Sequence, residues 1–231
     1  MSHRIGRDLP PLFVQELENR SCPAFVSLGF GGTVLAFTAA SGEDNDVTVT
    51  KTGDFPNIGY TIKDANHAIW ANAPPFAIQP DGTVVLAAPN GNNVQKVLIN
   101  LLNADDVAQV IGDIPCHMLG GDGKDKLLGS SLSDTLEGGA GEDYLDGQGG
   151  GDLLYGNSDN DLIFGGEGND TMYGGLGDDE FWGEGGDDRM VGEDGVDELN
   201  GGLGADTFVV TPVIDDPVDF DAMEGDVIIH V

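Results

Sequence analysis

The stretch Gly165–Trp182 reads GGEGNDTMYGGLGDDEFW, and it divides into two units of nine residues with one shared pattern. Each unit begins with Gly-Gly, has Asp at its sixth position and has a large apolar residue at its eighth. The same frame continues in both directions without a gap, so that ten consecutive nonapeptides run from Gly120 to Val209. A period repeated this many times is typical of a solenoid, in which each repeat is a small structural unit stacked on the next.

Three positions of the nonapeptide hardly vary among the units. The first residue is Gly in all ten units, and the eighth is large and apolar in all ten. The fourth is Gly in eight, with Leu132 and Asp159 as the exceptions in units two and five. The sixth is Asp in all ten, and these residues are the candidate metal ligands: Asp125, Asp134, Asp143, Asp152, Asp161, Asp170, Asp179, Asp188, Asp197 and Asp206.

The pattern predicts a local structure for each unit. Six residues rich in Gly make a tight turn with left-handed backbone angles at little steric cost. The next three predict a short strand whose apolar middle residue points inward. Because a turn and a strand every nine residues must coil, we expect two units to make one circuit around a thin apolar core.

The ten units in phase resemble the RTX (repeats-in-toxin, haemolysin-type) nonapeptide G-G-x-G-x-D-x-U-x, over about 90 of the 231 residues. The resemblance implies an all-β chain whose C-terminal part is a parallel β-roll, a right-handed β-solenoid. It also implies calcium between turns of successive circuits, bound by aspartate carboxylates and backbone carbonyl oxygens. In such a roll, odd-numbered turns line one edge of the stack and even-numbered turns the other, and the four gaps on each edge would hold a full set of about eight ions. Because Leu132 and Asp159 replace Gly, we expect their turns to be distorted and their sites to be weaker or empty.

The charge of the chain points in the same direction. It has 41 acidic and 9 basic residues, a net charge of −32, which repels nucleic acids and anionic membrane surfaces and favours cations. Residues 120–209 hold 23 of the acids and 26 of the 37 glycines. Crowded carboxylates around a thin core oppose folding, and a hard divalent cation with oxygen ligands removes their repulsion. The alternative, solvated Asp in turns, does not require Asp at one phase of ten units.

Composition changes near Leu119 and divides the chain into four parts. These are an N-terminal segment at 1–32, a smaller β-rich domain at 33–119, the β-roll at 120–209 and a C-terminal cap at 210–231. Before the roll, β-prone runs separated by Gly, Asn, Asp and Pro predict strands at Thr33–Thr38, Val47–Lys51, Tyr60–Lys63, Thr83–Ala87 and Val94–Leu102.

The two flanks of the roll have expected roles. Val94–Ile111 is similar to segments that lead into RTX arrays, with Asp105-Asp106-Val107 as a degenerate turn and strand. After the roll, Val227–Val231 is expected to pair as a final strand, because a solenoid end needs a cap. An uncleaved C-terminal secretion signal is the alternative for this segment, since many RTX proteins have one.

The sequence contains no recognisable catalytic motif. An H-E-x-x-H zinc motif, a G-x-S-x-G elbow, a P-loop and a dinucleotide fingerprint are all absent, and His3, His67, His117 and His230 are scattered. Asp159 and Asp161 do not continue as an EF-hand loop. We therefore expect a calcium-binding protein without enzymatic activity, in a structural or adhesive role. A fragment or accessory module of a secreted RTX enzyme or toxin is the alternative.

The resemblance implies a secreted, extracellular or cell-surface protein. Leu17-Glu18-Asn19-Arg20, followed by Pro23-Ala24, resembles a short N-terminal motif of large exported bacterial proteins. The uncharged run Pro23–Ala40 contains too much Gly, Ser and Thr for a membrane span. Cys22 and Cys116 would form one disulfide in an exported protein, and two buried free thiols are the equal alternative.

The outward positions seven and nine of the units carry aromatic residues. On the sheet of the odd units these positions include Tyr144, Leu162, Phe164 and Trp182. An exposed aromatic surface in so acidic a protein predicts a contact with the N-terminal domain folding back, with a second copy or with another protein surface. The alternative is that these side chains stabilise neighbouring strands by packing along the stack.

Overall fold

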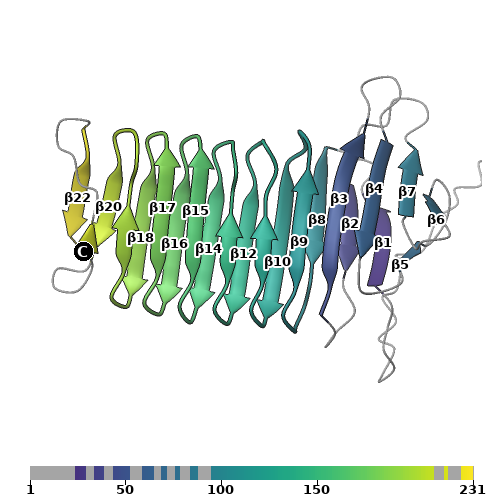
Figure 1. Ribbon diagram of the computed structural model, residues 1–231, viewed down its shortest axis with the longest axis horizontal. Coiled ribbons are helices and arrows are strands. Elements are labelled where there is room, and N and C mark those ends of the chain that lie inside the picture. The colour runs from purple at the N-terminus through teal and green to yellow at the C-terminus, as the bar shows by residue number, and fades with distance from the viewer. Residues whose placement is uncertain are drawn as a thin grey trace, which may run out of the picture.

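A computed structural model of the chain describes residues 24–29, 34–38, 44–52, 59–64, 69–71, 76–78, 84–87, 95–210, 216–217 and 225–230. All the secondary-structure elements in these ranges are β-strands, which confirms the all-β prediction. They form two sheets of eleven strands, here called sheet A and sheet B. Figure 1 shows one long stack, with β5 and β6 near one end and β22 at the other.

Both sheets are described from the end of the stack that holds the C-terminal strands. Sheet A contains β22 (Val227–His230), β20 (Thr207–Val210), β18 (Arg189–Asp194), β16 (Thr171–Leu176), β14 (Leu153–Ser158), β12 (Thr135–Ala140), β10 (Cys116–Asp122), β8 (Lys96–Asn100), β2 (Val34–Thr38), β1 (Ala24–Gly29) and β5 (Ile69–Ala71). Sheet B contains β21 (Asp216–Pro217), β19 (Glu198–Asn200), β17 (Glu180–Gly185), β15 (Leu162–Glu167), β13 (Tyr144–Asp146), β11 (Lys126–Leu128), β9 (Val107–Ile111), β3 (Asp46–Thr52), β4 (Gly59–Asp64), β7 (Val84–Ala87) and β6 (Phe76–Ile78).

The register of the strands shows the length of one circuit. Met172 of β16 lies between Leu154 of β14 and Met190 of β18, eighteen residues away in each direction, and all three strands are parallel. Positions seven to nine of the even units therefore lie on sheet A and those of the odd units on sheet B, as two nonapeptides per circuit require. The parallel stacks continue from β2 and β3 to β22 and β21, and they make about seven circuits.

The core of the roll is as thin as the pattern predicts. In most strands of the roll, position eight is buried between two partly or fully exposed neighbours, as in β13, β16 and β17. In β20, Val209 and Val210 are buried as well. The position-eight side chain is inaccessible to solvent in all ten units: Leu127, Leu136, Leu145, Leu154, Ile163, Met172, Phe181, Met190, Leu199 and Phe208.

Several strands are longer than the expected three residues. β12 and β14 to β18 each have six, because backbone pairing continues through the first three residues of the following unit. Gly175, at position two, is in register with Asn157 and Glu193 on the two neighbouring strands. The chain therefore reverses within a shorter segment than the six-residue turn that was predicted.

The strands extend beyond the ten units on both sides. β8 and β9 pair in parallel with β10 and β11, which confirms that Val94–Ile111 leads into the roll. β22 pairs in parallel with β20, as expected for the final strand, and Ile228 packs against the core. Beyond β2 and β3 the pairing changes, since β1 with β2, β3 with β4 and β4 with β7 are antiparallel.

The strands predicted before the roll are present as β2, β3, β4, β7 and β8, with shifted ends, whereas β1, β5 and β6 were not predicted. Cys22, His3, His67 and the motif at Leu17-Glu18-Asn19-Arg20 lie outside the described residues. In the ranges given above, no helix is long and apolar enough to span a membrane.

Candidate calcium site

The position-six aspartates form two hydrogen-bonded columns along the roll. In each, the backbone N–H of one aspartate donates to Oδ1 of the aspartate one circuit later, as from Asp143 to Asp161 at 2.8 Å and from Asp152 to Asp170 at 2.7 Å. We call these columns the odd ladder and the even ladder. The odd ladder contains Asn45, Asp106, Asp125, Asp143, Asp161, Asp179 and Asp197. The even ladder contains Cys116, Asp134, Asp152, Asp170, Asp188, Asp206 and Asp226.

The structure thus brings all ten predicted site residues into two lines. Each of the ten is buried, with at most 4% of its surface exposed. Because ten buried carboxylates lie in two lines, the simple reading of solvated turn residues is wrong.

The second carboxylate oxygen of seven of the ten position-six aspartates has no hydrogen-bond partner. Oδ2 is buried and accepts no hydrogen bond in these seven: Asp125, Asp143, Asp152, Asp161, Asp170, Asp179 and Asp188. A buried polar atom without a partner is costly and is rare in folded proteins. Because these oxygen atoms recur at a regular interval along the roll, their arrangement favours the binding of a positively charged group beside them.

Each orphan oxygen faces a small space beside the first Gly of its own unit. A Cβ placed on Gly147 would lie 2.3 Å from Asp152 Oδ2 and 2.6 Å from the carbonyl oxygen of Gly165. The same two kinds of oxygen surround Gly120, where Asp125 Oδ2 lies at 2.3 Å and the Gly138 carbonyl oxygen at 2.5 Å. The Gly at position one therefore leaves room for a carboxylate and a backbone carbonyl to approach the same point.

Burial makes these carboxylates hard to ionise without a counter-charge. Loss of solvation raises the pKa of Asp125 and Asp188 to about 7 and that of Asp152 and Asp161 to about 8. The N–H donated to Oδ1 lowers each pKa, and the neighbouring ladder carboxylates raise it again. A bound divalent cation would remove this penalty.

Unit two differs from the others at this point. The backbone N–H of Ser130 donates to Asp134 Oδ2 at 2.5 Å, and the Ser130 hydroxyl donates to Oδ1 at 3.3 Å. Neither Ser130 nor Leu132 has a positive φ, although positions two and four have one in most other units. The predicted distortion of the Leu132 turn is therefore confirmed, and its carboxylate is already hydrogen-bonded within the turn.

The same prediction for unit five is wrong. Asp159 adopts φ 75° at position four, so it keeps the left-handed backbone of the other turns. Asp is one of the few non-Gly residues that reach this region at low cost, because its short polar side chain bonds locally. Unit five consequently retains a regular turn, and Asp161 remains in the odd ladder.

Two further aspartates in the ladders were not among the predicted residues. Asp106 and Asp226 extend the ladders, at sequence separations of 19 from Asp106 to Asp125 and 20 from Asp206 to Asp226. These intervals break the period of eighteen, so a search in phase does not find them. The signal available was local, since both precede a β-prone run as position six does. Cys116 takes the corresponding place at the start of the even ladder, as a buried free thiol.

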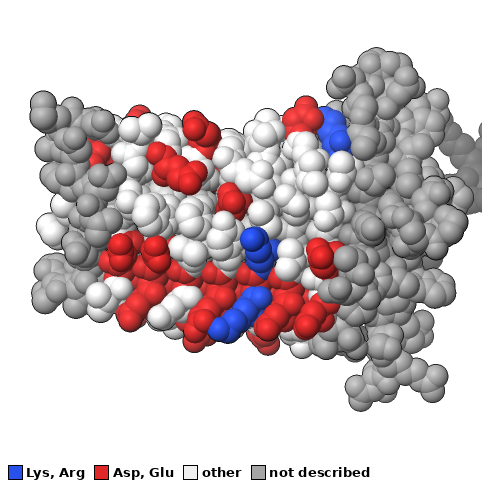
Figure 2. All heavy atoms as spheres, in the orientation of Figure 1, with Lys and Arg blue, Asp and Glu red and all other residues white. Residues whose placement is uncertain are grey.

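The edges of the roll carry further exposed charge. Figure 2 shows Asp and Glu gathered in a band along one long edge. The odd turns have more exposed acids outside the ladders than the even turns do. In the odd turns of the ten units these are Asp122, Glu142, Asp159, Asp178, Glu193 and Asp194, and in the even turns Glu167, Glu184 and Asp187.

Side chains alone do not assemble a metal site. Among the residues that the structure describes, no three His, Cys, Asp or Glu side chains gather closely enough to hold a metal ion. The ladder carboxylates succeed one another along the stack, and backbone carbonyl oxygens lie between them. Calcium accepts such a set, because it binds carboxylate and backbone oxygens in flexible geometry.

Comparison with known families agrees with the geometry of the roll. A family model described as RTX calcium-binding nonapeptide repeat (4 copies) matches residues 119–154, 146–181 and 173–208. RTX calcium-binding repeats therefore occupy residues 119–208 of this chain, as the resemblance implied. No curated protein and no solved structure matches the chain.

Proposed function

We propose that this chain binds several calcium ions along its two ladders, and that calcium binding is coupled to the folding of residues 120–209. The ten position-six aspartates would supply the carboxylate oxygens, and the turns would supply backbone carbonyl oxygens. The observation that carries this proposal is the row of seven buried Oδ2 atoms without hydrogen-bond partners. Ten units offer four gaps on each edge, which corresponds to about eight ions.

The energetics explain why folding and binding are linked. One side chain in nine is buried as core, so apolar burial barely offsets the entropy lost on ordering the chain. A buried carboxylate oxygen without a partner costs about 1–3 kcal/mol or more. A ligand that binds only the folded state adds about 2.7 kcal/mol at one hundred times its dissociation constant. Several sites of this kind decide whether the roll is ordered.

Hydrogen exchange on the full chain tests the proposal. Amides of residues 120–209 are expected to become protected in millimolar calcium and to exchange rapidly in a chelator. Magnesium at the same concentration serves as the control, because its smaller ion demands octahedral geometry and should protect less. Equal protection in calcium and in chelator would overturn the proposal.

We further propose that the protein is exported and has a structural or adhesive role outside the cell. Support comes from the RTX repeats, since proteins with these repeats are typically secreted. Extracellular calcium would then fold the roll after export, whereas the low calcium of a cytosol would leave it loose. Localisation of the protein in cells and in medium tests this proposal, and retention of all of it in the cytosol would contradict it.

A further inference from the structure

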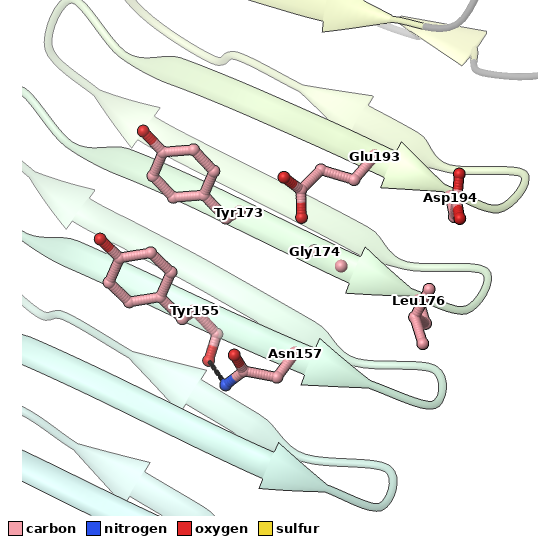
Figure 3. Close-up of a pocket in the computed structure, with 8 residues that line it drawn as sticks. Tyr155, Asn157, Tyr173, Gly174, Leu176, Glu193 and Asp194 are labelled. Atoms are coloured by element: carbon pink, nitrogen blue, oxygen red, sulfur yellow. Dashed lines mark hydrogen bonds between the residues drawn. The ribbon is translucent and has the colours of Figure 1, made fainter.

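A hollow of about 360 Å³ lies on the outer face of sheet A. Its side chains are those of Tyr155, Asn157, Tyr173, Leu176, Glu193 and Asp194. Figure 3 shows the two tyrosine rings side by side at one end and the other side chains beyond them. None of these six residues belongs to either ladder, so calcium binding does not account for the hollow.

A missing side chain creates this space. Gly175 of β16 lies in register between Asn157 of β14 and Glu193 of β18. All three occupy position two of successive odd units and have a positive φ. A Cβ on Gly175 would lie 2.1 Å from the Asn157 carbonyl oxygen, so the neighbouring strand leaves no room for a side chain at this position. The flanking side chains of Asn157 and Glu193 form two walls.

The polar groups around the hollow are mostly acceptors. In the described part of the chain, neither Glu193 nor Asp194 is joined in an ion pair by Lys, Arg or His. The Asn157 amide nitrogen donates to the Tyr155 carbonyl oxygen at 3.5 Å, which leaves the amide oxygen free to accept. In Figure 3 the Glu193 carboxylate points toward Tyr173. Negative charge therefore lies beside an aromatic ring.

On sheet B, a lysine of the chain itself lies over a tyrosine ring. Lys126 Nζ lies 4.5 Å from the centroid of the Tyr144 ring on the neighbouring strand. On sheet A, Tyr155 and Tyr173 stack at 5.1 Å with 10° between their planes. No Lys or Arg among the described residues lies over either ring. An ammonium group is attracted both by an aromatic face and by an adjacent carboxylate.

We propose that this hollow binds a primary alkylammonium group, from a free polyamine or from a Lys side chain of a basic peptide. The ammonium lies between the Glu193 carboxylate and the Tyr173 ring, and the Asn157 amide oxygen accepts a further hydrogen bond. The alkyl chain lies against Leu176. The net charge of −32 raises the local concentration of such cations.

The test is an NMR titration of the full chain in saturating calcium with 1,5-diaminopentane, after circular dichroism has shown that the roll is folded. Amide shifts are expected at Asn157, Gly175 and Glu193. Glu193→Gln keeps the backbone, because Gln148 already occupies position two with φ 68°. This change is expected to weaken binding by about fivefold. Tyr173→Leu, which removes the ring and keeps an apolar side chain, is expected to weaken it similarly.

Glu184→Gln is the matched control, since Glu184 is an exposed position-two residue of an even unit with φ 69°. Its affinity for the diamine should equal that of the unchanged chain. A Lys-containing peptide with a blocked N-terminus separates the two sources of ammonium: tighter binding than the diamine identifies a peptide, and equal or weaker binding identifies a free polyamine.

Four results would overturn the proposal in a chain that is folded: no shifts, equal shifts with neutral 1-pentanol or glucose, unchanged affinity in Glu193→Gln, or displacement of the diamine when calcium is raised further above the concentration that folds the roll. The last would make the hollow a further calcium site. Failure of calcium-coupled folding would appear separately, as dichroism that does not respond to calcium.

Discussion

A ladder aspartate has its two oxygens in different surroundings. Oδ1 is fixed by a backbone N–H of the preceding circuit, whereas Oδ2 of Asp170 and Asp188 is buried without a hydrogen-bond partner. Asp134 is the exception, because Ser130 donates to both of its oxygens. The same residue type at the same phase of the repeat should therefore contribute unequally to calcium binding.

Alanine substitution tests this inequality. We expect Asp170→Ala and Asp188→Ala to weaken calcium binding at the affected sites by roughly tenfold or more. Asp134→Ala should weaken it less, since its carboxylate is already occupied within a distorted turn. Calorimetric titration of the three variants measures the order, and equal or reversed losses would show that turn geometry does not control site quality.

The space beside position one permits a matched pair of changes in a single turn. Gly147→Ala should impair calcium binding and folding, because the added Cβ would lie 2.3 Å from Asp152 Oδ2. Gly149→Ala should be tolerated, because its nearest contact would be at 3.7 Å. Neither Gly has a positive φ, so backbone strain does not distinguish them. Melting curves with and without calcium compare the two variants. A similar loss of calcium-dependent stability in both would show that the space beside position one is not part of a calcium site.

At the scale of residues, the phase of the nonapeptide predicts most members of the two ladders and fails where the period of eighteen is interrupted. The ten aspartates of the nonapeptides are identified because burial repeats with the sequence. Asp106 and Asp226 are missed because an extra residue or two interrupts the count, while strand pairing tolerates the insertion. Asp159 shows the converse, since a residue that breaks the pattern keeps the turn when it can adopt a positive φ.

At the scale of elements, the two ladders couple folding to pH. Burial raises the pKa of ladder carboxyls such as Asp152 and Asp161 to about 8, from 3.8 in the unfolded reference. The folded chain without calcium thus binds protons more tightly than the unfolded chain. This contribution to stability is complete below about pH 4 and is lost as pH rises through the folded pKa values.

We therefore expect the calcium-free roll to gain structure as pH falls from about 8 to about 5. Calcium should bind more weakly at the lower pH, because protons compete for the same oxygens. Circular dichroism in calcium-stripped buffer and calorimetry at both pH values measure the two effects. A calcium-free roll that is most ordered at the higher pH would contradict this linkage.

The outer face of sheet B is the second element with a testable role. The Tyr144 and Phe164 rings are 5.3 Å apart, and the Phe164 and Trp182 rings are 6.4 Å apart and nearly parallel. These side chains are half-buried against one another, which favours packing along the stack. The alternative, a contact surface for another protein, stays a prediction.

The double change Phe164→Ser with Trp182→Ser separates the two roles. We expect it to lower the stability of the calcium-bound roll by roughly 3 kcal/mol without changing the sedimentation coefficient. Val191→Ser, at an outward position without a ring, should cost less. Chemical denaturation and sedimentation velocity give both quantities, and a changed oligomeric state would show that the face is an interface.

Element prediction succeeded where side chains repeat and was poorer elsewhere. The apolar residue that recurs every nine positions predicts the strands of the roll. It does not predict that these strands continue through the Gly-rich positions, because only backbone pairing extends them there. β5 and β6 have only three residues each, too short for a period of two to be visible. β5 pairs with β1, which lies far earlier in the sequence, whereas β6 pairs with β7, the next strand along the chain.

The whole molecule is a stack in which each parallel strand of the roll pairs only with the strands one circuit before and after it. Both ladders repeat this order, because each carboxylate is bound to the circuit that precedes it. No contact in such an arrangement requires the entire chain, and stability is close to a sum over neighbouring circuits.

Under mechanical load, such a stack should unfold sequentially, one circuit at a time, from the end that is pulled. A pull on the C-terminal end would release one circuit while the next stays wound, and each event would free eighteen residues, about 60 Å of extended chain. With calcium present, optical tweezers should record evenly spaced rips of that length at a raised force; in chelator the rips should merge into a smooth extension. A single large rip for the whole roll would mean that the circuits yield together.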